Sequence, residues 1–224
     1  MFWFLQPGVT LTDVLMRILS VLVIVFAILP LHELAHGWVA SKLGDNTAKY
    51  NGRLTLNPVA HIDPIGAIAI LLFGFGWAKA VPVNPRNFKN PKAGMAITAL
   101  AGPVSNLLAA LVGGILFNCV LLIPMTMQVF TWVSVFFTYY ISINVGLAVF
   151  NLIPVPPLDG SRIIGIFLSD RAWHKFYQYE NYIMIGMFVL LFTGVLDAPL
   201  GFMQNGCFKG VMWLADLPFR LFGL

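Results

Sequence analysis

The stretch AILPLHELAHGWVAS, residues 27–41, places two histidines and one glutamate in an otherwise apolar run. On a helix, His32 and His36 lie one turn apart on the same face, and Glu33 projects from the adjoining face. This is the H-E-x-x-H arrangement, in which two imidazoles bind one zinc ion and a carboxylate lies near the zinc-bound water. The stretch therefore predicts a helix with His32 and His36 as zinc ligands.

The composition indicates that this motif belongs to a membrane protein. Of the 224 residues, 59% are hydrophobic and 10% are charged, whereas about 25% are charged in soluble globular domains. The mean hydropathy is +0.85. Such a chain cannot bury its apolar side chains in one aqueous core, so we expect an integral membrane protein with the lipid bilayer as its solvent. Its 13 basic residues are scattered between apolar segments, so no nucleic-acid partner is expected.

Long apolar segments with few charged residues predict an all-α fold with about four transmembrane helices. About 25 residues separate Arg17 from Lys42, and as a helix of about 37 Å they can cross about 30 Å of hydrocarbon. The 66 residues from Ala93 to Leu158 contain no Asp, Glu, Lys or Arg and fit two further spans. The four expected spans are about 10–41, 94–118, 130–153 and 179–196.

Two shorter features are expected between the first and second spans. Pro64–Ala78 offers 15 uncharged residues, about 22 Å of helix, which is too short to cross and predicts a re-entrant segment. The run AKYNGRLTL, residues 48–56, has Asn51-Gly52 between strand-like runs, which predicts a small membrane-associated β-hairpin with a type I′ turn. We expect one polytopic domain over residues 1–224, with a core at 10–165 and a C-terminal span and interfacial tail at 176–224.

The basic residues predict the orientation of the chain in the membrane. Ten of the 13 lie in Lys42–Lys92 and Arg162–Lys175, and with a re-entrant segment between the first two spans both stretches lie on one side. The positive-inside rule makes that side the cytoplasm. We therefore expect a multi-pass protein of the cell membrane. His32 lies within about 20 Å of the cytoplasmic boundary by this count, so the zinc site is expected towards that side.

A catalytic zinc ion takes three protein ligands and a water, so a third side chain is needed. The sequence offers five candidates: His61, Asp63, Asp159, Asp170 and His174. We favour Asp159 because it lies in NLIPVPPLDG, residues 151–160, whose three prolines must break a transmembrane helix. Unwound backbone at membrane depth is tolerated only where it lines a cavity or is buried in protein. His61 is expected to be a loop residue.

Three motifs in this order, HELAH at 32–36, GPVSN at 102–106 and NLIPVPPLDG at 151–160, resemble the site-2 protease family of intramembrane metalloproteases. The resemblance covers most of residues 20–165. It is to the compact bacterial or archaeal type, without PDZ or CBS modules. It implies a zinc metalloendopeptidase that hydrolyses peptide bonds in or near transmembrane segments of membrane proteins, as in regulated intramembrane proteolysis.

The resemblance also implies the roles of individual residues. One Zn²⁺ per chain would be bound by His32, His36 and Asp159. Glu33 would be the catalytic acid and base, and Asn151 would help hold the substrate or the oxyanion.

Three further residues are expected to be structural or to position the substrate. Asn106 belongs to the second family motif. The family also suggests a substrate-pairing strand near the active site, which we assign to the exposed edge of the expected hairpin, at Tyr50 and Leu54.

Two other functional classes are compatible with these residues: a non-enzymatic zinc-binding membrane regulator and an ion-coupled transporter with intramembrane histidine and glutamate. The H-E-x-x-H motif favours an enzyme over both classes. A purely structural zinc site needs no unligated carboxylate such as Glu33 beside it, and a transporter needs no metal. Transporters also usually contain internal repeats, and this sequence shows none.

Overall fold

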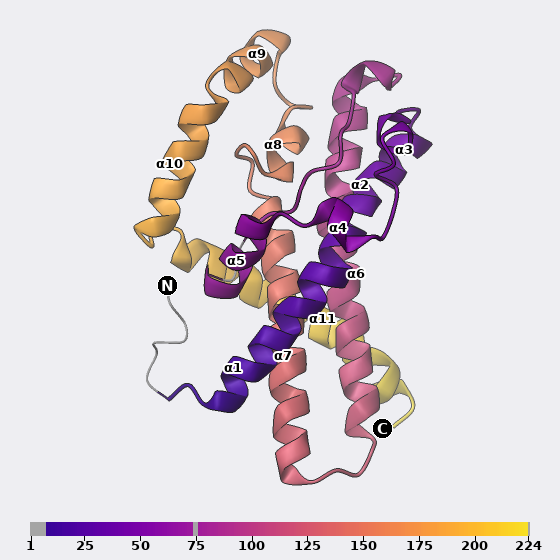
Figure 1. Ribbon diagram of the computed structural model, residues 1–224, viewed down its shortest axis with the longest axis vertical. Helices are drawn as coiled ribbons and strands as arrows, with labels where there is room; N and C mark the ends of the chain where they lie inside the picture. The colour runs from indigo at the N-terminus through magenta and orange to yellow at the C-terminus, as the bar shows by residue number, and fades with distance from the viewer. Residues whose placement is uncertain (1–7, 74–75, 224) are drawn as a thin grey trace.

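The computed structural model describes residues 8–73 and 76–223, and its regular secondary structure over these ranges is helical, with no strand (Figure 1). Three continuous helical stretches in it are long and apolar enough to cross a membrane: Leu11–Lys42, Pro91–Leu121 and Met127–Asn151. The prediction of an all-α membrane protein is confirmed. The expected count of four spans and the expected β-hairpin are not supported.

The first of these stretches consists of α1 (Leu11–Val23), a π turn η2 (Ile24–Ile28) and α2 (Leu29–Lys42). A capping box starts α1, because the Thr10 hydroxyl accepts the backbone N–H of Asp13 and the Asp13 carboxylate accepts that of Thr10. Pro30 has no N–H to donate to the preceding turn, and the helix widens into the π turn just before it. The histidine motif follows in the regular helix α2.

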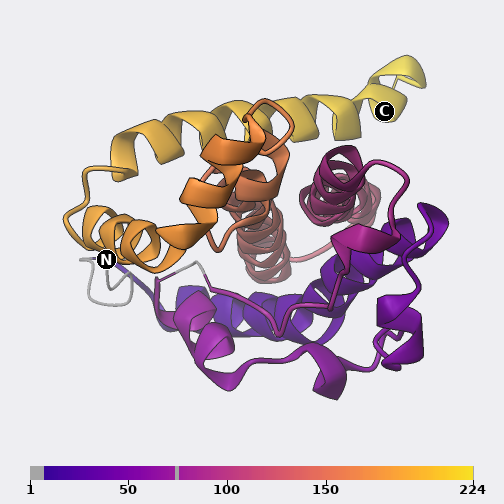
Figure 2. The same ribbon diagram turned by 90° about the horizontal axis from the view of Figure 1, so that it is seen from above.

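Helices α6 (Pro91–Leu121) and α7 (Met127–Asn151) form an antiparallel pair at the centre of the molecule. Figure 2 shows them nearly end-on, with the first stretch on one side and α11 (Asp197–Leu221) across the other. Small residues let these helices approach closely, since a Cβ on Gly113 would overlap the Tyr140 ring. The core thus has three layers, with α6 and α7 in the middle one.

The fourth expected span is replaced by shorter helices. Helix α9 (Asp170–Gln178) leads into α10 (Glu180–Phe192), which has 13 residues. That length gives about 20 Å, short of the hydrocarbon thickness of about 30 Å. Gly194 adopts a φ of 73°, which ends the apolar run in a turn before α11 begins. Hydropathy alone did not indicate this break.

The predicted β-hairpin is wrong because Asn51-Gly52 ends a helix. The run instead forms α3 (Thr47–Tyr50), and a type I′ turn would need positive φ at both central residues, whereas Asn51 has φ −87°. Gly52 alone is left-handed, with φ 65°. Its N–H bonds to Lys49 O and the N–H of Arg53 to Ala48 O, which is the Schellman pattern of a helix C-terminus.

The connection between α2 and α6 contains further short helices: α4 (Pro58–His61), α5 (Pro64–Phe73) and the 3-10 turn η3 (Pro85–Asn87). Another short helix, α8 (Asp159–Ile164), follows α7. Helix α5 has 10 residues, about 15 Å, and is too short to cross a bilayer, as expected for this segment. Residues 77–84 have no regular secondary structure, and this extended segment runs past α2 towards η3.

Asp45 fastens this extended segment to the end of the first stretch. Its side chain is fully buried, and its carboxylate accepts hydrogen bonds from Asn84 N (2.7 Å), Asn87 Nδ2 (2.7 Å) and Thr47 N (3.0 Å). Burial raises the pKa of Asp45, but the hydrogen bonds from Thr47, Asn87 and Asn84 lower it further, and the net pKa lies below the ordinary 3.8. The ionised form is therefore the one that the fold stabilises.

We expect Asp45→Asn to lower the free energy of unfolding at pH 7 by about 1–3 kcal/mol. The substitution replaces one accepting oxygen by an NH₂ group, which would face the N–H groups that now donate to Asp45. Because the folded pKa is depressed, the stabilisation by Asp45 is complete above pH 4 or so and is lost as the pH falls through the folded value. Thermal unfolding in detergent at pH 7 and pH 3 measures this. Asp197→Asn, at an exposed carboxylate, is the control, and equal shifts for both variants would contradict the assignment.

Candidate metal centre and active site

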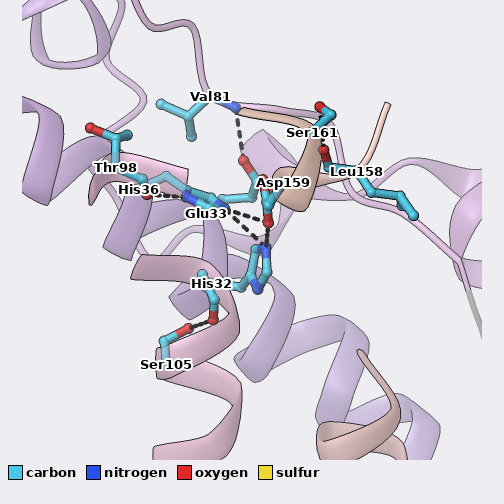
Figure 3. A network of polar contacts seen from close by, with 10 residues as sticks. His32, Glu33, His36, Val81, Thr98, Ser105, Leu158, Asp159 and Ser161 are labelled. Carbon is cyan, nitrogen blue, oxygen red and sulfur yellow. Dashed lines mark hydrogen bonds and ion pairs between the residues drawn. The ribbon is translucent and has the colours of Figure 1, made fainter. Parts of the chain in front are cut away.

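Three side chains from two separate helices meet beside the central pair (Figure 3). The Nε2 atoms of His32 and His36 are 3.0 Å apart, and Asp159 Oδ2 lies 3.4 Å and 3.3 Å from them. A tetrahedral zinc ion with bonds of about 2.0–2.1 Å has its ligand atoms about 3.3 Å apart. The two nitrogens and one carboxylate oxygen thus fit a catalytic zinc ion both in spacing and in donor type.

Asp159 reaches the histidines because α7 ends at Asn151 and the chain turns back on itself. Helix α8 starts at Asp159, and a Cβ on Gly160 would overlap the carbonyl oxygens of Leu152 and Ile153. Only glycine allows so close a return. Burial raises the pKa of Asp159, but the neighbouring His36 and His32 lower it further, so its pKa lies below the ordinary range. The ionised carboxylate is the form that binds a metal ion.

Helix α6 orients one imidazole and leaves room for both. His36 Nδ1 lies 2.7 Å from the carbonyl oxygen of Thr98 and therefore donates its hydrogen there, which leaves Nε2 for the metal. A Cβ on Gly102, one turn further along α6, would overlap both imidazole rings. In this structure the first residue of the GPVSN motif must therefore be glycine, because a larger side chain would collide with the two imidazoles.

Glu33 lies beside the three ligands and is not one of the clustered groups. Its side chain is buried, with 7% of the residue exposed, and its Oε2 accepts the backbone N–H of Val81 at 2.8 Å. Val81 lies in the extended segment at residues 77–84. Sequence reasoning missed this contact, because a backbone N–H has no residue signature. Pro82 and Pro85 nevertheless signal extended backbone there.

An apolar cavity of about 460 Å³ opens onto the cluster. Its walls include the extended segment, with Trp77, Ala80 and Val83, and Asn151 at the end of α7. Helix α10 adds one wall that no sequence motif indicated, formed by Met184, Met187, Phe188 and Leu191. Such a pocket suits the side chains of an apolar peptide segment.

The other predicted residues lie elsewhere. His61 is fully buried at the end of α4 with its Nε2 2.8 Å from Thr55 O, and Asp63 Oδ1 accepts Gly66 N. His61 and Asp63 are therefore not part of the metal cluster. The side chains of Asp170 and His174 lie outside the described part of the structure.

The residues predicted to position the substrate are not brought to the cavity wall. Tyr50 is 83% exposed, and Leu54 packs against Gly37 on α2. With the hairpin gone, neither has the strand edge that motivated its assignment. Asn106 is fully buried in α6 and does not line the cavity.

Comparisons with known proteins agree with this geometry. The model of "Peptidase family M50" matches residues 20–194. The chain belongs to this family, the site-2 proteases. It is 46% identical over 175 residues to the "Putative zinc metalloprotease YwhC" of Bacillus subtilis, covering 76% of this chain and 77% of the relative. It is 28% identical over 193 residues to the "Putative zinc metalloprotease Rip2" of Mycobacterium tuberculosis, covering 84% and 69%. No solved structure matches the chain.

The chain is thus a membrane-embedded metalloprotease with zinc as its metal. The predictions of the family, the enzyme class and the cofactor are confirmed. The assignment of individual residues to roles in the site stays a prediction, which the geometry above makes testable.

We expect Gly102→Ala to weaken zinc binding about 10- to 100-fold, because a methyl group forced against both imidazoles costs about 1–3 kcal/mol. Zinc affinity of the purified protein, measured by competition with a chelator, tests this. Gly210→Ala is the matched control, since no atom lies within 4 Å of its added Cβ. Parental zinc affinity in Gly102→Ala would show that α6 does not confine the imidazoles.

Proposed function

We propose that this metalloprotease is an intramembrane endopeptidase that cleaves transmembrane protein substrates in or near their membrane segments, as in regulated intramembrane proteolysis. The observation that supports this most directly is the position of the cluster. His32, Glu33 and His36 lie on a helical stretch long and apolar enough to span a membrane, and the cavity beside them is mostly apolar. A segment of a membrane protein fits such surroundings better than a soluble peptide does.

In this proposal His32, His36 and Asp159 hold the zinc ion. When bound, zinc supplies Lewis-acid polarisation of the scissile carbonyl and lowers the pKa of water towards 7. The two histidines come from α2 and the aspartate from the start of α8, so the zinc ion would link these two helices.

Glu33 is the group that moves protons. It takes a proton from the attacking water and later delivers it to the nitrogen of the leaving peptide. The N–H of Val81, 2.8 Å from Glu33 Oε2, holds the Glu33 carboxylate in place. Asn151 lines the cavity, and in this proposal it donates a hydrogen bond to the oxyanion.

A helical substrate must unwind before cleavage, because its amides are internally hydrogen-bonded. The extended segment at 77–84 lines the cavity and carries backbone groups beside Glu33. In this proposal the unwound substrate lies along this segment. Its backbone pairs with the extended backbone there, which is the role that the sequence analysis assigned to the edge of a hairpin. The basic stretches that flank the site favour a cell membrane location with the site towards the cytoplasm.

The proposal is tested by three proteins reconstituted in liposomes: the parent, Glu33→Gln and Asp159→Asn. Membrane proteins trapped on Glu33→Gln in native membranes and identified by mass spectrometry serve as substrates. We expect about one zinc per chain in the parent and in Glu33→Gln, and much less in Asp159→Asn. Cleavage by Glu33→Gln should fall about 10²- to 10⁴-fold. Cleavage at the parental rate in Glu33→Gln would reject the proposed role of Glu33.

The contact between Val81 and Glu33 has its own test. Val81→Pro removes the N–H that Glu33 accepts and should lower kcat/KM about 10- to 100-fold with zinc content unchanged, since a hydrogen bond to a charged group contributes about 1.5–3 kcal/mol. Leu56→Pro is the control, because Leu56 lies outside the cavity wall and its N–H makes no hydrogen bond in the described part of the chain. An equal loss in both variants would mean that proline only distorts the connection between α2 and α6.

A further inference from the structure

A layer of buried polar groups lies in the helix core beside the metal ligands. Asn106 on α6 and Asn144 on α7 are fully buried, and His32 on α2 is nearly so. Asn144 Nδ2 donates to Tyr140 O at 2.9 Å. Within the described structure, four other atoms of this layer have no protein hydrogen-bond partner: His32 Nδ1, Asn106 Oδ1, Asn106 Nδ2 and Asn144 Oδ1. Buried polar groups are nearly always hydrogen-bonded, so these four need an explanation.

The helix register puts Asn106 one turn of α6 beyond the level of His32, and because side chains lean towards the N-terminus of their own helix, the two side chains on these antiparallel helices lean towards each other. Helices α2 and α6 run in opposite directions, since His36 lies against Thr98 and the earlier His32 lies against Gly102. Asn106 follows Gly102 by one turn and is rotated about 40° from it around α6. Ala110, one turn further, packs in the cluster shared with α7. Asn106 therefore lies on the face of α6 between Gly102, which is turned to α2, and Ala110, which is turned to α7.

Asn144 lies at about the same level from the other side. The Tyr140 hydroxyl donates to Ala109 O at 3.4 Å, which fixes the register of α7 against α6. One turn along α7 from Tyr140, in the direction of Asn151, comes Asn144, and the antiparallel path of α6 reaches Asn106 at nearly the same height. Two buried amides thus lie at one level of the core, about one helical turn from the level of His32.

The two histidines differ in how their second nitrogen is satisfied. His36 donates Nδ1–H to Thr98 O, whereas the Nδ1 of His32 has no such acceptor and points away from Asp159 (Figure 3). A histidine that binds zinc almost always donates its other N–H to an oxygen, which fixes the tautomer and the ring orientation. His32 therefore lacks its expected second partner within hydrogen-bond distance.

We infer that Asn106 is the positioning residue for His32. One buried water accepts the Nδ1–H of His32 and donates its two hydrogens to Asn106 Oδ1 and Asn144 Oδ1. A buried water typically makes about three hydrogen bonds to such groups. The bridge keeps Nε2 free of hydrogen and turned towards Asp159. This inference rests on the proposed role of His32 as a zinc ligand and gives the asparagine of the GPVSN motif a role other than contact with substrate.

The test measures zinc affinity by competition with a chelator on purified full-length protein, so it does not depend on a substrate. Asn106→Leu should bind zinc about 10- to 100-fold more weakly than the parent. The matched control is Asn118→Leu on the same helix, about 18 Å further along, where the amide donates to Asp216 at 2.8 Å. This control should keep parental zinc affinity.

A second variant separates positioning from packing. Asn106→Asp keeps an acceptor towards His32 and should retain zinc affinity within about threefold of the parent, or tighten it, as in carboxylate–histidine–zinc triads. A packing role predicts instead that both substitutions weaken zinc binding alike. If Asn106→Leu does not fold, the zinc affinity of Asn106→Ala, which adds no bulk, is compared with that of Asn106→Asp instead.

Three results would contradict the proposed role of Asn106. Parental zinc affinity in Asn106→Leu, equal losses in Asn106→Leu and Asn118→Leu, or equal losses in Asn106→Leu and Asn106→Asp would overturn the inference. Failure of the proposed zinc site itself would appear differently, as a parent protein that binds no zinc.

Discussion

The meeting of one carboxylate with two imidazoles in an apolar helix core is the contact on which the rest of the site depends. A charged side chain at the centre of a bilayer costs about 2.5–3.5 kcal/mol on insertion scales. A divalent ion between Asp159 and the two histidines, with Glu33 beside it, balances these charges locally. The separations of 3.0–3.4 Å between the ligand atoms leave room for one small ion.

Much of the surrounding structure serves to make that meeting sterically possible. Gly160 lets α8 return against the end of α7, and Gly102 lets α6 approach the imidazoles. The polar connection between α2 and α6 has a different task, which is to hold Glu33. Its extended segment is fixed by Asp45 at one end, and at the other by Lys79, whose N–H bonds to His61 O at 2.7 Å. The backbone of His61 thus helps to hold the segment that contacts Glu33.

The parts that could be predicted from the sequence are those with a signal in residue type and spacing. The pattern of His32, Glu33 and His36 needs only the helical period, and Asp159 followed from the rule that broken backbone at membrane depth must line a cavity. The three long apolar helices followed from runs without charge. In each case one physical rule related residue order to structure without knowledge of tertiary contacts.

The other features could not be predicted, because they depend on tertiary contacts or because the same sequence pattern is compatible with two structures. Asn51-Gly52 serves a helix C-terminus as well as a hairpin, and only the neighbouring backbone decides between them. The apolar run at 179–196 looked like a span until the turn at Gly194 divided it. Val81 acts through its backbone, so its side chain gave no indication, and the wall formed by α10 is visible only once the chain is folded.

X-ray absorption at the zinc edge of the purified protein tests the central contact most directly. The account predicts one zinc per chain with two imidazole nitrogens and only oxygen atoms besides, at about 2.0–2.1 Å. It also predicts that Asp159→Asn loses an oxygen neighbour or the ion itself. A sulfur neighbour at about 2.3 Å, a third imidazole, or a spectrum unchanged by Asp159→Asn would contradict it.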